Sequence, residues 1–237
     1  MAPCSFERPH HKAIATILKS LDADLLAGNH CLFGGGTAIA LRYGEYRESV
    51  DIGFLVSDLV GYRNLRQLVT APAGLGSITR PGATIRTLRE IRADQYGIRT
   101  IIGAGDIHIK FEIVLEARIQ FMPPDPDGGL CGVATLTPLD MLASKLLANA
   151  DRWADDSVFS RDLIDMAMMQ PAARLMQSAC EKAESAYGAS IRRDLDQAVS
   201  KLLTRDGRLE QCMSALQMET PKALLWQRLK ALASRRT

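Results

Sequence analysis

Residues 30–56 read HCLFGGGTAIALRYGEYRESVDIGFLV, and this stretch decides the fold. A short apolar run ends at Phe33, three glycines follow, and a helical pattern then runs to Gly44. After a polar connection, apolar residues alternate with Asp51 and Gly53, which predicts a strand with one polar face. The stretch therefore predicts a strand, a glycine turn, a short helix and a return strand.

The sequence on either side extends this unit. Apolar residues at helical spacing predict one amphipathic helix from His11 to Leu26, and Ser57 or Asp58 can cap a second helix. Farther along, two apolar arms around a glycine-containing loop at 103–105 predict a hairpin, and a further strand is expected at 118–122. The mixture of strands and helices indicates an α/β domain.

From residue 137 onward the pattern is helical. Thr137 is the expected N-cap of a helix that begins at Pro138, and little strand signal remains after it. We therefore predict an α+β protein with a mixed sheet and flanking helices in residues 1–136, followed by a C-terminal helical bundle in residues 137–237.

The bulk composition excludes several classes of protein. The chain has 237 residues, of which 47% are hydrophobic, so it can bury a sizeable core and overall disorder is not expected. No run approaches the roughly 18 apolar residues of a membrane span, and the N-terminus lacks the pattern of a signal peptide. We expect a soluble, cytoplasmic protein with no membrane partner.

Cysteine and histidine usage gives no sign of a disulfide framework or a zinc site. The five cysteines are odd in number, scattered and without a C-x-x-C pair, so we expect them to be small buried apolar residues. The four histidines lack the i, i+4 spacing of a helical zinc site.

Positive charge is concentrated in one part of the chain, although the formal net charge is only +2. Between Gly61 and Thr100 only Glu90 and Asp94 balance a series of arginines: Arg63, Arg66, Arg80, Arg86, Arg89, Arg92 and Arg99. These side chains form a basic binding surface if they converge. The alternative, an arginine-rich face exposed to solvent, is equally open.

The glycine turn and the return strand carry the candidate chemistry. Gly35, Gly36 and Thr37 open a helix, where unpaired backbone N–H groups and the positive end of the dipole suit a phosphate, although such turns are also common in structural roles. The return strand brings Asp51 to the same end of the sheet, and a carboxylate beside a triphosphate is a ligand for Mg²⁺ or Mn²⁺. Glu112 is expected to supply another ligand from a neighbouring strand. The pattern indicates a site for a nucleoside triphosphate (NTP) with a divalent metal ion.

Two blocks of the sequence resemble a known family. The turn at 35–37 together with Arg47-Glu48-Ser49-Val50-Asp51-Ile52 is similar to the G-G-T … R-x-S-x-D-[IL]-D signature of the AbiEii/AbiGii-type nucleotidyltransferases, the toxin halves of type IV toxin–antitoxin systems. Lys145, Arg152 and Arg161-Asp162-Leu163-Ile164-Asp165 are similar to the family's K … R … R-D-[LI]-x-D run. The resemblance extends from about residue 32 to residue 165.

The resemblance implies a nucleotidyltransferase-like sheet and assigns roles to the matching residues. Lys145 is expected to bind the triphosphate, Arg47 is a further candidate for nucleotide binding, and Asp51 and Asp162 are the candidate catalytic residues.

Structural roles remain open for several of these residues. Arg47 is a candidate for holding the entry to the strand, and Asp165 for orienting Lys145 or Arg161 rather than binding a ligand. In the alternative interpretation, Lys145 and Asp162 are simply charged residues on a solvated helix face.

The sequence departs from the family pattern at one position. The second strand aspartate falls on Gly53, so the strand presents one carboxylate, Asp51, where the family presents two. Three interpretations are open: Glu112, Asp106 or Asp58 compensates; the protein binds nucleotide without turning it over; or Gly53 is an engineered or incidental substitution.

The leading hypothesis is that the chain transfers a nucleotide from an NTP to an RNA (tRNA-like) or protein acceptor, as a toxin with a cognate antitoxin protein as partner. The alternative, motivated by Gly53, is a catalytically impaired nucleotide- or RNA-binding protein that retains the fold. A third possibility is a helical interaction module, because the residues after about 170 match no motif.

Overall fold

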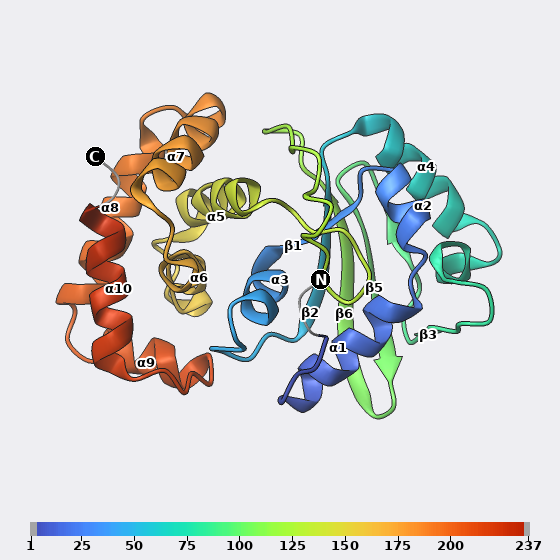
Figure 1. The fold of residues 1–237 in the computed structure, drawn as a ribbon, viewed down its shortest axis with the longest axis horizontal. Coiled ribbons are helices and arrows are strands. Elements are labelled where there is room, and N and C mark those ends of the chain that lie inside the picture. Colours follow the sequence, from blue (N-terminus) through green and yellow to red (C-terminus); the bar gives the residue numbers. More distant parts are fainter. Residues whose placement is uncertain (1–3, 235–237) are drawn as a thin grey trace. The chain divides into compact units, whose positions relative to one another are not determined.

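The structure, a computed structural model, describes residues 4–234, and these residues form two compact units (Figure 1). The first unit contains residues up to Arg42 and Ser49–Thr137, and the second contains Tyr43–Glu48 and residues from Pro138 onward. The sequence analysis placed residues 43–48 in the first domain, whereas in the structure they pack with the C-terminal helices. This short segment is central to the candidate site.

The first unit is built on a mixed sheet, as predicted. Its strands are β1 (Leu32–Gly34), β2 (Asp51–Val56), β3 (Arg86–Thr87), β4 (Arg92–Ala93), β5 (Gly97–Ala104) and β6 (Ile107–Leu115). The order is β1-β2-β6-β5-β3, with β4 also pairing with β5; β2 and β6 run parallel and the other pairs run antiparallel. The β5–β6 hairpin confirms the prediction made from the glycine loop at 103–105.

The core of the first unit lies on one face of this sheet. Phe33, Phe54 and Phe111 come from neighbouring strands. The ring centroid of Phe54 lies 5.5 Å from that of Phe33 and 5.9 Å from that of Phe111. All three side chains are fully buried. Because strand side chains alternate between faces, the residues between these aromatics point to the opposite face, where the polar side chains of β2 and β6 lie.

Helices flank the sheet: α1 (Pro9–Ser20), α2 (Ala23–Gly28), α3 (Gly35–Arg42), α4 (Leu59–Thr70) and the 3-10 helix η1 (Gly74–Ile78). The Asp58 carboxylate caps α4 by accepting hydrogen bonds from the N–H groups of Val60 and Gly61, which confirms one of the two predicted caps.

Two local predictions in the first unit were wrong. The single helix expected from His11 to Leu26 is broken, because Asp22 caps a new helix through Leu25 N–H and its own N–H donates to Ile78 O at 2.9 Å. No strand forms at 118–122, because the backbone N–H groups of Arg118 and Phe121 donate to the side chains of Glu116 and Ser57. In both places side-chain acceptors replace the expected backbone partners.

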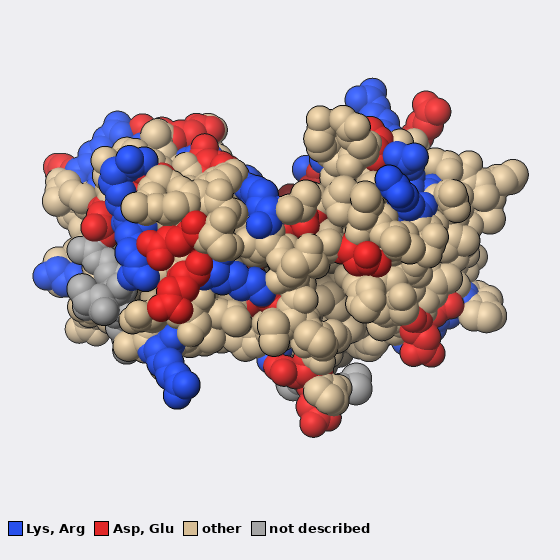
Figure 2. All heavy atoms as spheres, turned by 90° about the horizontal axis from the view of Figure 1, so that it is seen from above, with Lys and Arg blue, Asp and Glu red and all other residues tan. Residues whose placement is uncertain are grey.

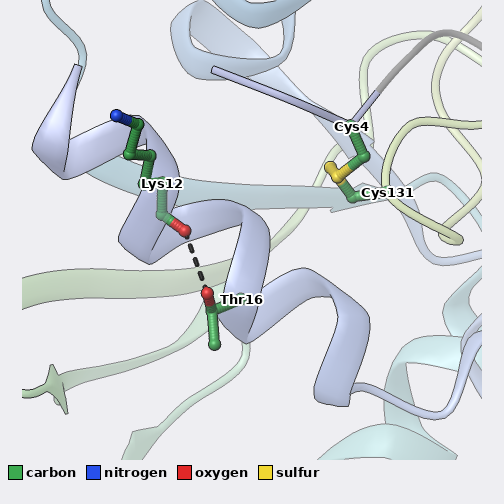
Figure 3. Close-up of a disulfide and its surroundings, with 4 residues drawn as sticks. All are labelled: Cys4, Lys12, Thr16 and Cys131. Carbon is green, nitrogen blue, oxygen red and sulfur yellow. Dashed lines mark hydrogen bonds between the residues drawn. A yellow bond between two sulfur atoms is a disulfide. The ribbon is translucent and has the colours of Figure 1, made fainter. Parts of the chain in front are cut away.

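A disulfide also contradicts the expectation for the cysteines. Cys4 is bonded to Cys131 within the first unit, with Cα atoms 5.1 Å apart (Figure 3). The partners are 127 residues apart in sequence and have no spacing motif, so pattern alone gave no signal for the bond. Cys31, Cys180 and Cys212 are buried free thiols, as expected.

The second unit is helical, as predicted. Its helices are α5 (Pro138–Arg152), η2 (Asp156–Val158), α6 (Arg161–Met169), α7 (Ala173–Tyr187), α8 (Ser190–Thr204), α9 (Arg208–Ala215) and α10 (Lys222–Ser234). Helix α5 contacts α6, α7 and α8 and buries Met141, Leu142 and Leu146 among them. Among the helices of residues 4–234, none has the length and hydropathy needed to cross a membrane.

Candidate functional site

The glycine turn is fixed to the strand that carries Asp51. Gly35 has a φ of +73°, a left-handed conformation that disfavours a side chain, and α3 begins at this residue. The Thr37 hydroxyl donates to the carbonyl oxygen of Asp51 and lies 2.7 Å from the Ser49 hydroxyl. The Ser49 N–H in turn donates to Nε2 of the buried His11 at 3.1 Å. The start of α3 is therefore held against the entry to β2.

These contacts define what the turn can offer to a phosphate. The single hydroxyl proton of Thr37 is used on Asp51 O, so the donors available at Gly35 and Gly36 are backbone N–H groups at the start of α3. The Ser49 hydroxyl contacts Thr37 and its backbone N–H contacts His11, so both groups hold the turn against the strand.

The polar face of the sheet brings Asp51 and Glu112 together with two cations. In the parallel pair β2–β6, Asp51 is the partner of Lys110 and Gly53 is the partner of Glu112, so all four positions share one face. Within residues 4–234 the Asp51 carboxylate has no hydrogen-bond or ion-pair partner. Glu112 differs, because its Oε1 lies 2.8 Å from Lys110 Nζ and 3.3 Å from Arg99 Nε.

This donor set limits the metal that the face can hold. Among residues 4–234 there is no cluster of three or more histidine, cysteine, aspartate or glutamate side chains suited to a metal ion. Asp58 is used as a helix cap, and Gly53 has no side chain. Magnesium often binds through one or two carboxylates together with substrate phosphates and water. Asp51 therefore fits one ion that arrives with a triphosphate, and the face does not fit a pair of ions held by protein carboxylates.

A cavity borders the cations of this face. It has a volume of about 530 Å³ and is lined by Arg89, Glu90, Arg92, Arg99, Thr100, Ile101 and Lys110. Three of the arginines considered in the sequence analysis therefore converge. Others serve the fold: Arg80 donates to Leu21 O, and Arg86 donates to Gly105 O. These three arginines form a basic surface, but the other arginines of the segment do not line it.

The second unit contains an ion cluster, which we define as Arg47, Lys145, Arg152, Asp162 and Asp165. Lys145 Nζ lies 2.8 Å from Asp162 Oδ1 and 2.6 Å from Asp165 Oδ2. Arg47 makes a bidentate pair with Asp165 at 2.7 and 3.0 Å, and Arg152 does the same with Asp162 at 2.7 and 2.9 Å. Three cations thus share two carboxylates, and the third proton of the Lys145 ammonium remains for a further acceptor.

The cluster keeps both carboxyl groups ionised. Burial alone raises the pKa of Asp162, but Lys145 and Arg152 outweigh it and hold that pKa well below its usual range. For Asp165, Arg47 and Lys145 likewise overcome burial and lower the pKa. A carboxylate held in this way is a poor proton acceptor at neutral pH. The geometry favours Asp162 as a positioning residue for Lys145.

Tyr46 is a member of this site that the sequence analysis missed. Its hydroxyl donates to Asp165 Oδ1 at 2.6 Å, and burial followed by the charge of Asp165 raises its pKa well above the usual value. Its position one residue before Arg47 is the only local signal for it. Asp165 Oδ2 lies 2.6 Å from Lys145 Nζ, and Asp165 Oδ1 lies 2.7 Å from Arg47 Nε, so the contacts that the orienting role of Asp165 requires are present.

The surface of the second unit carries charges of both signs. On the face shown in Figure 2, its Lys and Arg side chains lie beside Asp and Glu side chains. In the same unit, Asp156 pairs with Lys201 and Arg205 at 2.8 and 2.7 Å. On that face the second unit does not present a patch of one sign, whereas the cavity of the first unit is lined by four cations and one acidic residue.

One family model matches most of the chain. The family model "Nucleotidyl transferase AbiEii toxin, Type IV TA system" matches residues 16–235, so the match includes the C-terminal helices for which the sequence analysis found no motif. No curated protein matches the chain.

Five chains of solved structures match this chain, and the following two are among them. JHP933 from Helicobacter pylori is 18% identical, with 96% of this chain and 91% of that chain covered and a TM-score of 0.47. MenT4, a nucleotidyltransferase toxin from Mycobacterium tuberculosis H37Rv, is 15% identical, with 95% and 85% covered and a TM-score of 0.45.

Proposed function

Because the chain belongs to the AbiEii nucleotidyl transferase toxin family of type IV toxin–antitoxin systems, we propose that it transfers a nucleotide from an NTP to an RNA acceptor. The observation that carries this proposal is the unpaired Asp51 carboxylate, which lies on one sheet face with Lys110 and next in the fold to the start of α3. A free carboxylate beside phosphate-binding groups is the arrangement that a metal-bound triphosphate requires.

The reaction places few chemical demands on the protein. The acceptor hydroxyl oxygen forms a bond to the α-phosphorus, the bond from that phosphorus to the bridging oxygen breaks, pyrophosphate leaves with the electron pair, and the hydroxyl proton passes to water. A magnesium or manganese ion bound with the triphosphate neutralises phosphate charge. The protein contributes positioning: backbone N–H groups of Gly35 and Gly36 for phosphate and Asp51 for the bound metal.

The roles of Lys145 and Asp162 in this reaction are part of the proposal and rest on the family motif. Lys145 retains one unpaired N–H donor, which we assign to a phosphate oxygen, and Asp162 positions Lys145. Arg47 acts on the same group through Asp165.

The RNA acceptor is supported by the basic cavity of the first unit. Arg89, Arg92, Arg99 and Lys110 line it together with Glu90, while Glu112 pairs with Arg99 and Lys110 from outside the lining. Clustered cations favour a phosphate backbone over an uncharged protein surface. The proposal includes an antitoxin protein as partner, as the family description implies, and a cytoplasmic location, where NTPs and tRNA are found.

The decisive experiment is transfer of label from each α-³²P NTP, with magnesium or manganese, to total tRNA. We expect labelled RNA with the unaltered chain and none with Asp51→Asn. Saturable NTP binding without transfer by the unaltered chain, under every metal and NTP, contradicts the proposal.

The second candidate function, a nucleotide-binding protein without turnover, is favoured by Gly53. A Cβ at this position meets only Gly34 O, at 3.7 Å, so the Cβ of an aspartate fits there without displacing a neighbouring atom. If this alternative holds, Gly53→Asp transfers label and the unaltered chain does not. Transfer by the unaltered chain excludes the alternative.

A further inference from the structure

From the polar face of the sheet we infer that Lys110 binds a phosphate group of the triphosphate, in the place of the second metal ion that an aspartate at position 53 would help to hold. Glu112 and Arg99 position this lysine. The inference rests on the proposed function, because it concerns the same triphosphate, but it makes a separate claim about which group supplies the second positive charge.

The strand register places Lys110 directly beside Asp51. The two residues are Cα partners in the parallel pair β2–β6, so their side chains leave the sheet on the same face from adjacent strands. Lys110 is also the cationic neighbour nearest to Asp51 in this register. A ligand that contacts the Asp51 carboxylate through a metal ion is therefore within reach of a lysine ammonium.

The next row of the sheet holds Lys110 in place. Gly53, Glu112 and Arg99 are register partners across β2, β6 and β5. Glu112 Oε1 accepts from Lys110 Nζ at 2.8 Å and faces Arg99 Nε at 3.3 Å, so one carboxylate oxygen holds both cations. Lys110 keeps two further N–H donors for phosphate oxygens, and about 46% of its side chain is exposed.

The charges of this face suit a glycine rather than an aspartate at position 53. The face carries two carboxylates, Asp51 and Glu112, and two cations, Lys110 and Arg99, and Arg99 also lies 3.6 Å from Asp94. With an aspartate at position 53 the face would be negative and would need an additional cation before it accepted a triphosphate. Gly53 and the paired lysine therefore complement each other.

A cavity beside Lys110, whose lining includes no residue of β2, gives this lysine room to contact a phosphate. Lys110, Arg99, Arg92 and Arg89 line a space of about 530 Å³, within the range of roughly 300–1,000 Å³ that is usual for small-molecule sites. The cavity is an observation independent of the strand register, and it shows that the two cations of the face border open space rather than packed protein.

The test uses inorganic tripolyphosphate as the probe, because it removes the unknown base from the measurement. Binding is measured by calorimetry in EDTA for the full chain and for Lys110→Met, Lys110→Arg and Lys12→Met. We expect binding by the unaltered chain, an affinity at least about tenfold lower for Lys110→Met, and recovery to within about threefold for Lys110→Arg. Lys12, an exposed lysine of α1 in the same unit, is the matched control and its loss leaves the affinity unchanged.

Equal affinities for Lys110→Met and the unaltered chain overturn the inference, provided that circular dichroism shows both to be folded. An equal loss in Lys12→Met also overturns it, because the effect then reflects net charge rather than position.

Manganese counting gives a second test that does not depend on activity. Electron paramagnetic resonance is expected to show one Mn²⁺ per bound tripolyphosphate in the unaltered chain and two in Gly53→Asp. Two bound ions in the unaltered chain overturn the inference. If tripolyphosphate binding depends on Lys110 but no label is transferred, only the proposed function is rejected. If label is transferred but tripolyphosphate binding does not depend on Lys110, only the inference is rejected.

Discussion

Replacing Asp165 by asparagine removes the acceptor at the centre of the ion cluster. Asp165 is fully buried and accepts hydrogen bonds from Tyr46, Arg47 and Lys145 at 2.6 to 3.0 Å. Asparagine keeps the size of the side chain, but it loses the charge and turns one acceptor into an N–H donor that faces other donors. Arg47 and Lys145 are left with Asp162 as the remaining carboxylate of the cluster.

The expected cost follows from the loss of one member of a buried ion pair, which is about 3–5 kcal/mol. With a urea dependence of roughly 2 kcal/mol per molar for a unit of this size, the unfolding midpoint of the second unit falls by about 1.5–2.5 M. Both tryptophans, Trp153 and Trp226, lie in the second unit, so their fluorescence reports its unfolding specifically.

The matched control is Glu210→Gln, which breaks an exposed ion pair with Lys222 in the same unit. No measurable shift of the midpoint is expected for this variant. If Asp165→Asn and Glu210→Gln move the midpoint equally little, the cluster does not hold residues 43–48 to the C-terminal helices, and the reasoning is refuted.

Three further results are expected. Because ion pairing lowers the pKa of Asp165, the stability advantage of the unaltered chain over Asp165→Asn is complete above about pH 5 and shrinks as the pH falls through the unfolded value near 3.9; an advantage that persists unchanged at pH 2 in urea titrations contradicts this. Gly35→Ala forces a side chain into a left-handed conformation and lowers the stability of the first unit by about 1–2 kcal/mol, whereas Gly53→Ala, with ordinary φ and open space, is close to neutral in thermal melts. Thiol titration of the unfolded, unreduced chain finds three thiols rather than five, and Cys131→Ser, which breaks the bond to Cys4, destabilises the first unit by about 2–5 kcal/mol; five thiols reject the disulfide.

The sequence predicted those elements whose signal is local. The β5–β6 hairpin, the cap at Asp58 and the helices after Pro138 follow from periodicity, glycine and capping residues within short windows. The break at Asp22 was missed, because it depends on a hydrogen bond to Ile78, which is distant in sequence. The disulfide was missed because it likewise joins residues that are distant in sequence.

The candidate site was predictable in part. The sequence analysis selected Glu112 as a residue of a neighbouring strand, and the family motif selected Asp51, Lys145 and Asp162. What the sequence did not contain is the register between β2 and β6, which makes Lys110 the neighbour of Asp51. Register is set by packing of the whole sheet, so the salt bridges of Glu112 became visible only in the structure.

The segment 43–48 has a consequence for any attempt to divide this protein. The sequence suggests a cut near residue 137, but a polypeptide that starts at Pro138 lacks both Tyr46 and Arg47, and so retains Asp165 without two of its three donors. The second unit is thus not one continuous segment of the polypeptide, because the six residues 43–48, which lie within the N-terminal half of the sequence, belong to it. Expressed alone, the C-terminal half would need those residues supplied as a peptide or grafted through a linker to regain its full stability.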